Sequence, residues 1–172
     1  MWQYHGYWVP EGAVGERFFR NLTPDGLTMH DAEQVERCVA ACGPRLQVAV
    51  DGGAYVGTWS LHLAKHFANV IAYEPVPSNV DCWRRNLEGK SHASVVQAAL
   101  SSHDGLAVMY HMHKAYTGRV RERDFADQAN GTAEVRAKRL DDANLPVLDL
   151  LKLDVEGHEY HALMGALETI KR

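Results

Sequence analysis

Two consecutive strand–turn–helix units in the first half of the chain constrain its fold more than any other feature. Residues 46–50 form a short apolar run rich in β-branched side chains, which predicts a buried strand. A glycine-rich turn follows at 51–57, and apolar side chains then recur every fourth residue across 58–67, as on one face of a helix. The first unit is therefore predicted to be a strand, a tight turn and a helix.

The same order repeats immediately. A strand is predicted at 70–73, a helix at about 78–87 and a third strand at 95–98. Ser78 and Asp81 have the spacing of a capping box at the start of that helix. Parallel strands joined by right-handed helical crossovers form a sheet that is covered on both faces. We therefore expect an α/β protein with a doubly wound, mostly parallel sheet, of the kind that holds a nucleotide-like ligand.

The rest of the chain is predicted to be a lead-in and a strand-rich second half. Aromatic residues and glycines in the first thirty positions predict an extended segment with turns, followed by a helix at 31–42. Strands are predicted at 106–111, 133–139 and 148–153, with a charged loop at 112–132 and a final helix from about His158. A chain of 172 residues is long enough for one globular domain. We divide it into an aromatic-rich segment with its helix, 1–45, and a ligand-binding domain, 46–172.

Charge and cysteine content narrow the classes of partner. The chain has 18 basic and 22 acidic side chains, a net charge of −4, which argues against a protein that wraps duplex nucleic acid. Its apolar runs fall well short of the roughly 20 residues that a membrane span requires. The first residues lack the pattern of a secretion signal, and three cysteines are too few for a disulfide framework. We expect a cytoplasmic protein that binds neither duplex nucleic acid nor membrane.

The chemistry is predicted to lie in the glycine turn and in an acid after the second strand. Asp51, Gly53 and Gly57 depart from the G-x-G-x-x-G spacing of dinucleotide sites. A looser turn before a helix N-terminus suits a ligand with an adenosine and a carboxylate but no pyrophosphate, such as S-adenosylmethionine. Glu74, 23 residues after Asp51, stands where an acid accepts hydrogen bonds from ribose hydroxyls. Its structural alternative is an acid that caps the loop before Pro75.

Four segments in this order resemble the motifs of the FkbM-type S-adenosylmethionine-dependent methyltransferases. They are 50–57 (VDGGAYVG), 72–75 (AYEP), 98–101 (AALS) and, above all, 151–159 (LKLDVEGHE). The segment 7–12 (YWVPEG) is similar to the front of small FkbM-like proteins, including phage-encoded ones. The resemblance covers 46–172 well and the first 45 residues loosely. It implies a Rossmann-like methyltransferase fold with S-adenosylmethionine as cofactor and S-adenosylhomocysteine as product.

The resemblance also implies site residues. The expected cofactor-binding residues are Asp51, Gly52, Gly53, Tyr55, Gly57, Glu74, Val76, Asn79, Ala98 and Ala99. The catalytic candidates are Asp154, Glu156 and His158, with Asp154 the first choice by position, and His111 and His113 are further candidates for a base. We predict no metal site, because the histidine pair His62 and His66 lacks a third ligand nearby.

The expected reaction is methyl transfer to a hydroxyl of a small molecule or glycan. A methyl sulfonium is already electrophilic, so the enzyme mainly aligns the reactants, and a hydroxyl acceptor also needs a base. The alternative is a non-catalytic S-adenosylmethionine- or nucleotide-binding module in a larger assembly. The family fold continues with further strands, so we expect a C-terminally short domain that lacks the last strands. Its apolar sheet edge would then be covered by a second subunit of a homo-oligomer.

Overall fold

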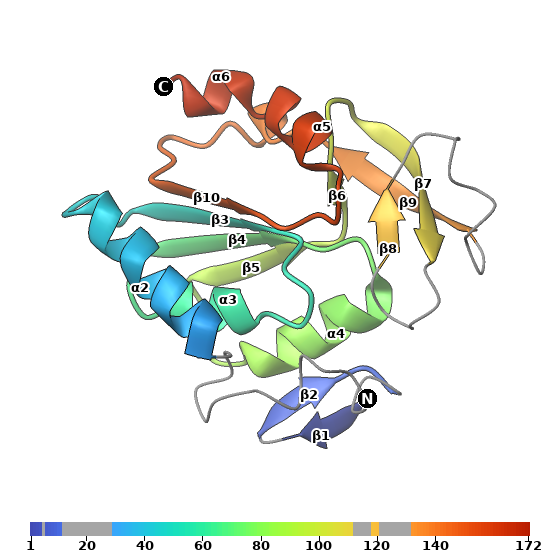
Figure 1. Ribbon diagram of the computed structural model, residues 1–172, viewed down its shortest axis with the longest axis horizontal. Helices are drawn as coiled ribbons and strands as arrows, with labels where there is room; N and C mark the ends of the chain where they lie inside the picture. Colours follow the sequence, from blue (N-terminus) through green and yellow to red (C-terminus); the bar gives the residue numbers. More distant parts are fainter. Residues whose placement is uncertain (5, 12–28, 112–117, 121–131) are drawn as a thin grey trace.

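The centre of the protein is a four-stranded, fully parallel sheet in the order β10-β3-β4-β5 (Figure 1). The computed structural model describes residues 1–4, 6–11, 29–111, 118–120 and 132–172. The four strands are β3 (Val48–Gly52), β4 (Asn69–Tyr73), β5 (Ala93–Val96) and β10 (Leu150–Leu153). The two predicted strand–turn–helix units and the predicted strand near the end of the chain thus form one sheet.

Helices cover both faces of this sheet, as the doubly wound prediction requires (Figure 1). One layer contains α2 (Met29–Cys42), α3 (Thr58–Leu63) and α4 (Pro77–Asn86), and the other contains α5 (Glu159–Met164) and α6 (Leu167–Ile170). Successive side chains of a strand point to opposite faces. Accordingly Val50 packs with Ala162 of α5 on one face, whereas Ala49 packs with Val35 of α2 on the other. The fold is therefore α/β with a mostly parallel, doubly wound sheet.

A second four-stranded sheet in the order β6-β9-β7-β8 lies beside the first. Its strands are β6 (Ala99–Leu100), β7 (Gly105–His111), β8 (Gly118–Val120) and β9 (Thr132–Lys138). β7 pairs antiparallel with both β8 and β9, whereas β6 pairs parallel with β9, so this sheet is mixed. The strands predicted at 106–111 and 133–139 are present, but they belong to a sheet that the sequence did not separate from the first.

Several local predictions were wrong. The first strand runs from Val48 to Gly52 rather than over 46–50, so Asp51 and Gly52 belong to β3 and not to the turn. The third strand ends at Val96 rather than at residue 98, because Ala98 N–H turns back to the carbonyl of Val96 and the chain crosses to the second sheet. The α4 helix starts at Pro77 after Val76, with no side-chain cap, so Ser78 and Asp81 form no capping box. The helix predicted to 67 ends at Leu63, and His66 lies in the turn beyond it.

The N-terminal aromatic segment forms a hairpin that packs on α4 (Figure 1). Its strands are β1 (Trp2–Tyr4) and β2 (Tyr7–Val9). The Asn86 side chain accepts a hydrogen bond from Trp8 N and donates to Trp8 O and Val56 O, at 2.7, 2.9 and 2.8 Å. The Arg85 guanidinium lies 4.7 Å from the centre of the Trp8 ring. The hairpin is thereby tied to the end of the glycine-rich turn, while 12–28 lie outside the described residues.

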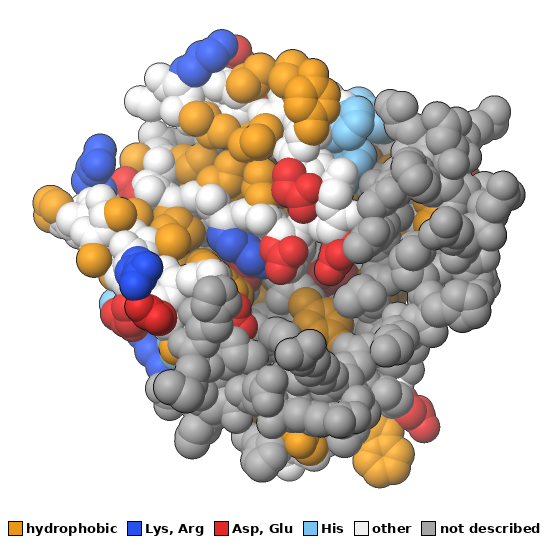
Figure 2. All heavy atoms as spheres, viewed as in Figure 1, with side chains coloured by type: hydrophobic (Ala, Val, Ile, Leu, Met, Phe, Trp, Pro, Cys, Tyr) orange, Lys and Arg blue, Asp and Glu red, His pale blue; other side chains and the backbone are white. Residues whose placement is uncertain are grey.

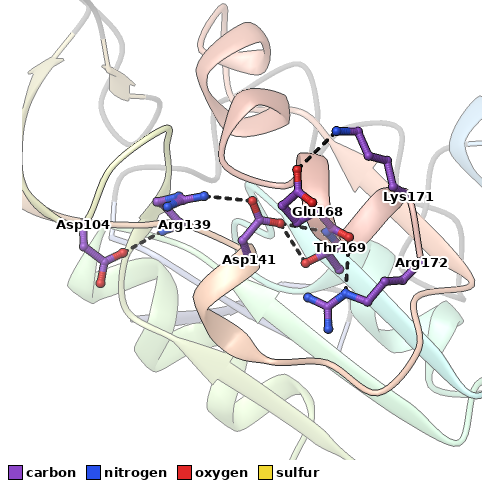
Figure 3. A network of polar contacts seen from close by, with 7 residues as sticks. All are labelled: Asp104, Arg139, Asp141, Glu168, Thr169, Lys171 and Arg172. Atoms are coloured by element: carbon purple, nitrogen blue, oxygen red, sulfur yellow. Dashed lines mark hydrogen bonds and ion pairs between the residues drawn. The ribbon is translucent and has the colours of Figure 1, made fainter.

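A polar network fixes the C-terminal helix α6 on the loop before β10 (Figure 3). Asp141, in the short helix η3 (Asp141–Ala143), accepts hydrogen bonds from Thr169 N and Thr169 Oγ1 at 2.8 and 2.9 Å. Its other oxygen lies 3.0 Å from Arg139. Burial acts to raise the pKa of Asp141, but the hydrogen bonds from Thr169 and Arg139 outweigh it, so the pKa is lowered. The ionised carboxylate therefore stabilises the folded state.

We expect acid to weaken this network before it unfolds the sheet. Because the pKa of Asp141 is lower in the folded state, its contribution is complete above the ordinary carboxyl pKa and is lost as pH falls through the lowered value. The protection factor of the Thr169 amide, its intrinsic exchange rate at a given pH divided by the observed rate, should fall below about pH 4. In Asp141→Asn this protection factor should already be low at neutral pH, with little further change on acidification. Equal pH dependence in both proteins would contradict this role.

Among the residues that the structure describes, no helix is both long and apolar enough to cross a membrane.

Candidate cofactor site at the carboxyl ends of the strands

The motif-bearing segments meet at one end of the central sheet. Gly53 N and Ala54 N donate to the carbonyl of Tyr73 at 2.9 and 3.1 Å, which joins the glycine turn to the end of β4. Asp154 N donates to the carbonyl of Gly52 at 3.0 Å, which joins the same turn to the end of β10. Acidic side chains gather on the face around these loops (Figure 2). Ligands of open α/β sheets bind at this edge.

The glycines of the turn are required by the packing of the chain itself. Gly53 has a φ of 75°, and a Cβ there would lie 2.0 Å from the carbonyl oxygen of Asp154. Gly57 has a φ of 90°, and its Cβ would lie 2.6 Å from the Trp83 ring. A Cβ on Gly52 would lie 2.7 Å from Leu153. At Gly53 and Gly57 the positive φ and these close contacts within the protein already explain the glycine.

Asp51 points into the protein and is fully buried. Its Oδ1 lies 2.9 Å from Lys152 Nζ, and its Oδ2 accepts a hydrogen bond from Ser60 Oγ at 2.6 Å. Ser60 Oγ in turn accepts one from Trp83 Nε1 at 2.9 Å. The carboxylate thus contacts Lys152, whose ammonium also binds the carbonyls of Gly52 and Gly53. Direct contact between Asp51 and a cofactor stays a prediction.

Glu74 gathers three of the expected site residues around one buried carboxylate, which is 5% exposed. Oε2 accepts a hydrogen bond from Tyr55 N at 2.9 Å, and Oε1 accepts from Val76 N at 2.9 Å and from Asn79 Nδ2 at 3.2 Å. Burial raises the pKa of Glu74, and these bonds and the charge of Lys152 oppose the rise. A carboxylate has about four lone-pair positions, so roughly one remains beyond these three bonds.

The carboxylate of Glu74 has a structural role in the loop that carries it. It caps the loop on the far side of Pro75, through Val76 N, whereas the structural alternative placed the cap before Pro75. It also holds Tyr55 in the left-handed region, with a φ of 52°. Ala98 and Ala99 are buried next to this region, with Ala98 in the main core and Ala99 in the second sheet, where Val76 packs. Contact of Glu74 and these alanines with a cofactor stays a prediction.

The three catalytic candidates have different surroundings. Asp154 is exposed, and Glu156 is half-buried with a φ of 55°. His158 is buried, with Nε2 3.1 Å from Ser101 Oγ and its ring stacked on His161 at 4.6 Å between centres. Of the three, Asp154 is the exposed side chain, while His158 contacts Ser101, just after β6, and His161 of α5. The side chain of His111, and all of His113, lie outside the described residues.

A pocket of about 360 Å³ opens beside Asp154, between α2, α3 and the free side of β10. It is lined by Asp31, Gln34 and Cys38 of α2, by Trp59, and by residues 150–154. This volume is at the lower end of the range for small-molecule sites, which is about 300–1,000 Å³. Asp154 is the residue that this pocket shares with the predicted site.

Sequence reasoning missed Lys152, Ser60 and Glu159. Lys152 is the charged residue in the otherwise apolar strand LLKL, which is a signal that could have identified it. Glu159 Oε1 accepts hydrogen bonds from Val155 N at 3.2 Å and Gly157 N at 3.1 Å, which fixes the loop that carries Asp154. Among the described residues no cluster of three or more His, Cys, Asp or Glu side chains has the geometry of a metal site.

Residues 51–172 match the methyltransferase FkbM domain, which is most of the chain. This chain belongs to the FkbM methyltransferase family. The match begins at Asp51 and includes the turn, Glu74, and the loop with Asp154. The recognition made from the four sequence motifs is therefore confirmed, and so is the Rossmann-like fold that it implied.

Two curated relatives of this FkbM-family chain are named methyltransferases. Methyltransferase sdnD of Sordaria araneosa is 32% identical over 155 residues, which covers 69% of this chain and 60% of that protein. Methyltransferase 1 of Beauveria bassiana (strain ARSEF 2860) is 27% identical over 165 residues, covering 80% of this chain and 66% of that protein. The chain thus spans 60–66% of the length of these relatives.

A solved S-adenosylmethionine-dependent methyltransferase from Leishmania major is also similar. It is 26% identical, with a TM-score of 0.36, and the similarity covers 41% of this chain and 30% of that one.

Proposed function

We propose that this chain forms the S-adenosylmethionine site of a methyltransferase that methylates a hydroxyl of a small molecule or glycan. The observation that carries the proposal is the meeting of the glycine turn, Glu74 and Asp154 at the carboxyl ends of three adjacent parallel strands. Membership of the FkbM methyltransferase family and the names of the relatives support it.

The donor set of the site fits this cofactor. S-adenosylmethionine carries a sulfonium and an ammonium, both cationic, and the site offers the carboxylates of Glu74 and Asp154. The remaining lone pair of Glu74 would accept a ribose hydroxyl, and the turn at Gly53 and Tyr55 would hold the methionine end. When bound, the cofactor supplies a methyl group on a positively charged sulfur.

The residues of the chain would then align the acceptor and take its proton. Asp154 is exposed at the pocket, and its loop is fixed by the hydrogen bond to Gly52 and by Glu159. A carboxylate in this place can accept the proton of an attacking hydroxyl.

We expect Asp154→Asn to lower turnover far more than cofactor affinity. The amide keeps the shape and polarity of the side chain but cannot take a proton, and loss of a positioned base typically costs about 10²–10⁴-fold. Turnover can be followed as the gain of one methyl mass in a cell extract incubated with the protein and S-adenosylmethionine. Equal losses of turnover and affinity would remove the catalytic role of Asp154.

Calorimetry with S-adenosylmethionine, S-adenosylhomocysteine and NAD tests the proposal as a whole. Binding of the first two without NAD is the expected result, and binding of NAD alone would overturn it. Binding of S-adenosylmethionine without any methylated product would instead favour the alternative, a non-catalytic binding module.

Two further expectations stay predictions. Hydrophobic side chains gather over α5, α6 and the neighbouring sheet edge (Figure 2). Leu163 and Met164 of α5 and Ile170 of α6 are exposed. In the described part of the chain β10 pairs with β3 alone, so a second subunit at this edge remains our prediction.

A cytoplasmic location, inferred from the cysteine content, also remains a prediction.

A further inference from the structure

Lys152 places one positive charge at the centre of the proposed cofactor site. It lies on β10, and its side chain is 11% exposed. Its Nζ lies 2.9 Å from Asp51 Oδ1, 2.9 Å from the carbonyl of Gly53 and 3.4 Å from that of Gly52. The two carbonyl contacts are hydrogen bonds, and the contact with Asp51 Oδ1 is an ion pair. Lys152 therefore binds both the carboxylate and the backbone of the glycine turn.

The same residue lines the pocket, and its charge acts on the carboxylate of Glu74. Lys152 lines the pocket next to Asp154, and its Nζ lies 5.9 Å from the centre of the Trp59 ring. Its charge also favours the ionised form of Glu74, against the effect of burial on the pKa of that group. The Lys152 ammonium thus acts on two carboxylates, those of Asp51 and Glu74. Lys152 itself lies on β10, the strand that leads to Asp154.

Asp51 cancels the charge of Lys152. A buried ion pair contributes little net stability compared with apolar residues, but removal of one partner leaves an uncompensated charge. An uncompensated ammonium beside the pocket would repel any cationic ligand. S-adenosylmethionine has a positive sulfur, whereas the sulfur of S-adenosylhomocysteine is neutral, and the two molecules are otherwise alike apart from the methyl group.

We propose that the Asp51–Lys152 pair is a positioning and charge-balancing unit that lets the site accept a sulfonium. Lys152 holds the carbonyls of the glycine turn, and Asp51 keeps the ammonium from repelling the cofactor. The inference rests on the proposed function, because it requires that the sulfonium cofactor binds here. It assigns to Asp51 an indirect role, since its carboxylate is fully buried.

The decisive quantity is the ratio of the affinities for S-adenosylmethionine and S-adenosylhomocysteine, measured by calorimetry. Asp51→Asn should lower the affinity for S-adenosylmethionine about tenfold more than the affinity for S-adenosylhomocysteine. Two unit charges roughly 10 Å apart in a protein interact with an energy that corresponds to about this factor. Lys152→Met, which leaves the carboxylate of Asp51 without its cation, should shift the ratio the other way. The double variant, which removes both charges, should return the ratio to that of the unmodified protein.

A merely structural role would weaken both ligands equally. Lys152→Arg keeps the charge and serves as the matched control, with an unchanged ratio expected. Circular dichroism shows which variants fold, and if Asp51→Asn does not, Lys152→Met decides by itself. An unmodified protein that binds neither ligand would overturn the proposed function, whereas one that binds both, with the same ratio in every folded variant, would overturn this inference alone.

Discussion

Gly53→Ala is expected to destabilise the protein by about 2–5 kcal/mol. The left-handed backbone at Gly53 costs a residue with a Cβ about 1–2 kcal/mol. The added Cβ would also lie 2.0 Å from the carbonyl oxygen of Asp154, which is backbone and cannot rotate away. Such overpacking destabilises the folded state by about a further 1–3 kcal/mol. Urea denaturation, with the free energy of unfolding extrapolated to water, measures the total.

Gly89→Ala is the matched control for this substitution. Gly89 has a φ of 83°, close to that of Gly53, but a Cβ there meets nothing within 4 Å. The control should therefore lose only the conformational part, about 1–2 kcal/mol. A larger loss at Gly53 assigns the difference to the contact between the glycine turn and the Asp154 loop. Similar losses at the two glycines would mean that the loop moves aside at little cost.

Glu74→Gln is expected to lower the affinity for S-adenosylmethionine by about 10–100-fold. A hydrogen bond to a charged group is worth about 1.5–3 kcal/mol, and the neutral amide loses this charge. Gln also replaces one acceptor oxygen by an NH₂ group, which would face one of the donors that Glu74 now binds, Tyr55 N or Val76 N. Calorimetry with the cofactor gives the affinity, and a thermal melt gives the change in stability.

Glu88→Gln, at an exposed position shortly after α4, controls for the loss of a negative charge elsewhere. It should leave both the affinity and the melting temperature unchanged. If Glu74→Gln lowered stability but bound the cofactor as tightly as the unmodified protein, Glu74 would be a loop cap and no more. That outcome would return the residue to the structural alternative that the sequence left open.

Local patterns predicted the elements of the central sheet well. The apolar runs at 46–50 and 70–73 correspond to β3 and β4. A strand that is buried on both faces is an almost continuous apolar run, which can be recognised in the sequence without knowledge of its neighbours. The glycine turn was also visible, since glycine is the residue that tolerates a positive φ. Some errors are at boundaries, as for the strand that ends at Val96 and the helix that ends at Leu63. The others are the absent capping box at Ser78 and the second sheet, which the sequence did not separate from the first.

The sequence by itself thus determined the parallel α/β core, the family, and the loops in which the site lies. Only the tertiary structure decided how the site residues are used. It turned Asp51 inward to Lys152, gave Glu74 three internal donors, and placed His158 against Ser101 instead of the pocket. The physical reason is that buried charges and hydrogen-bonding groups must find partners, and those partners come from distant parts of the chain that no local pattern connects.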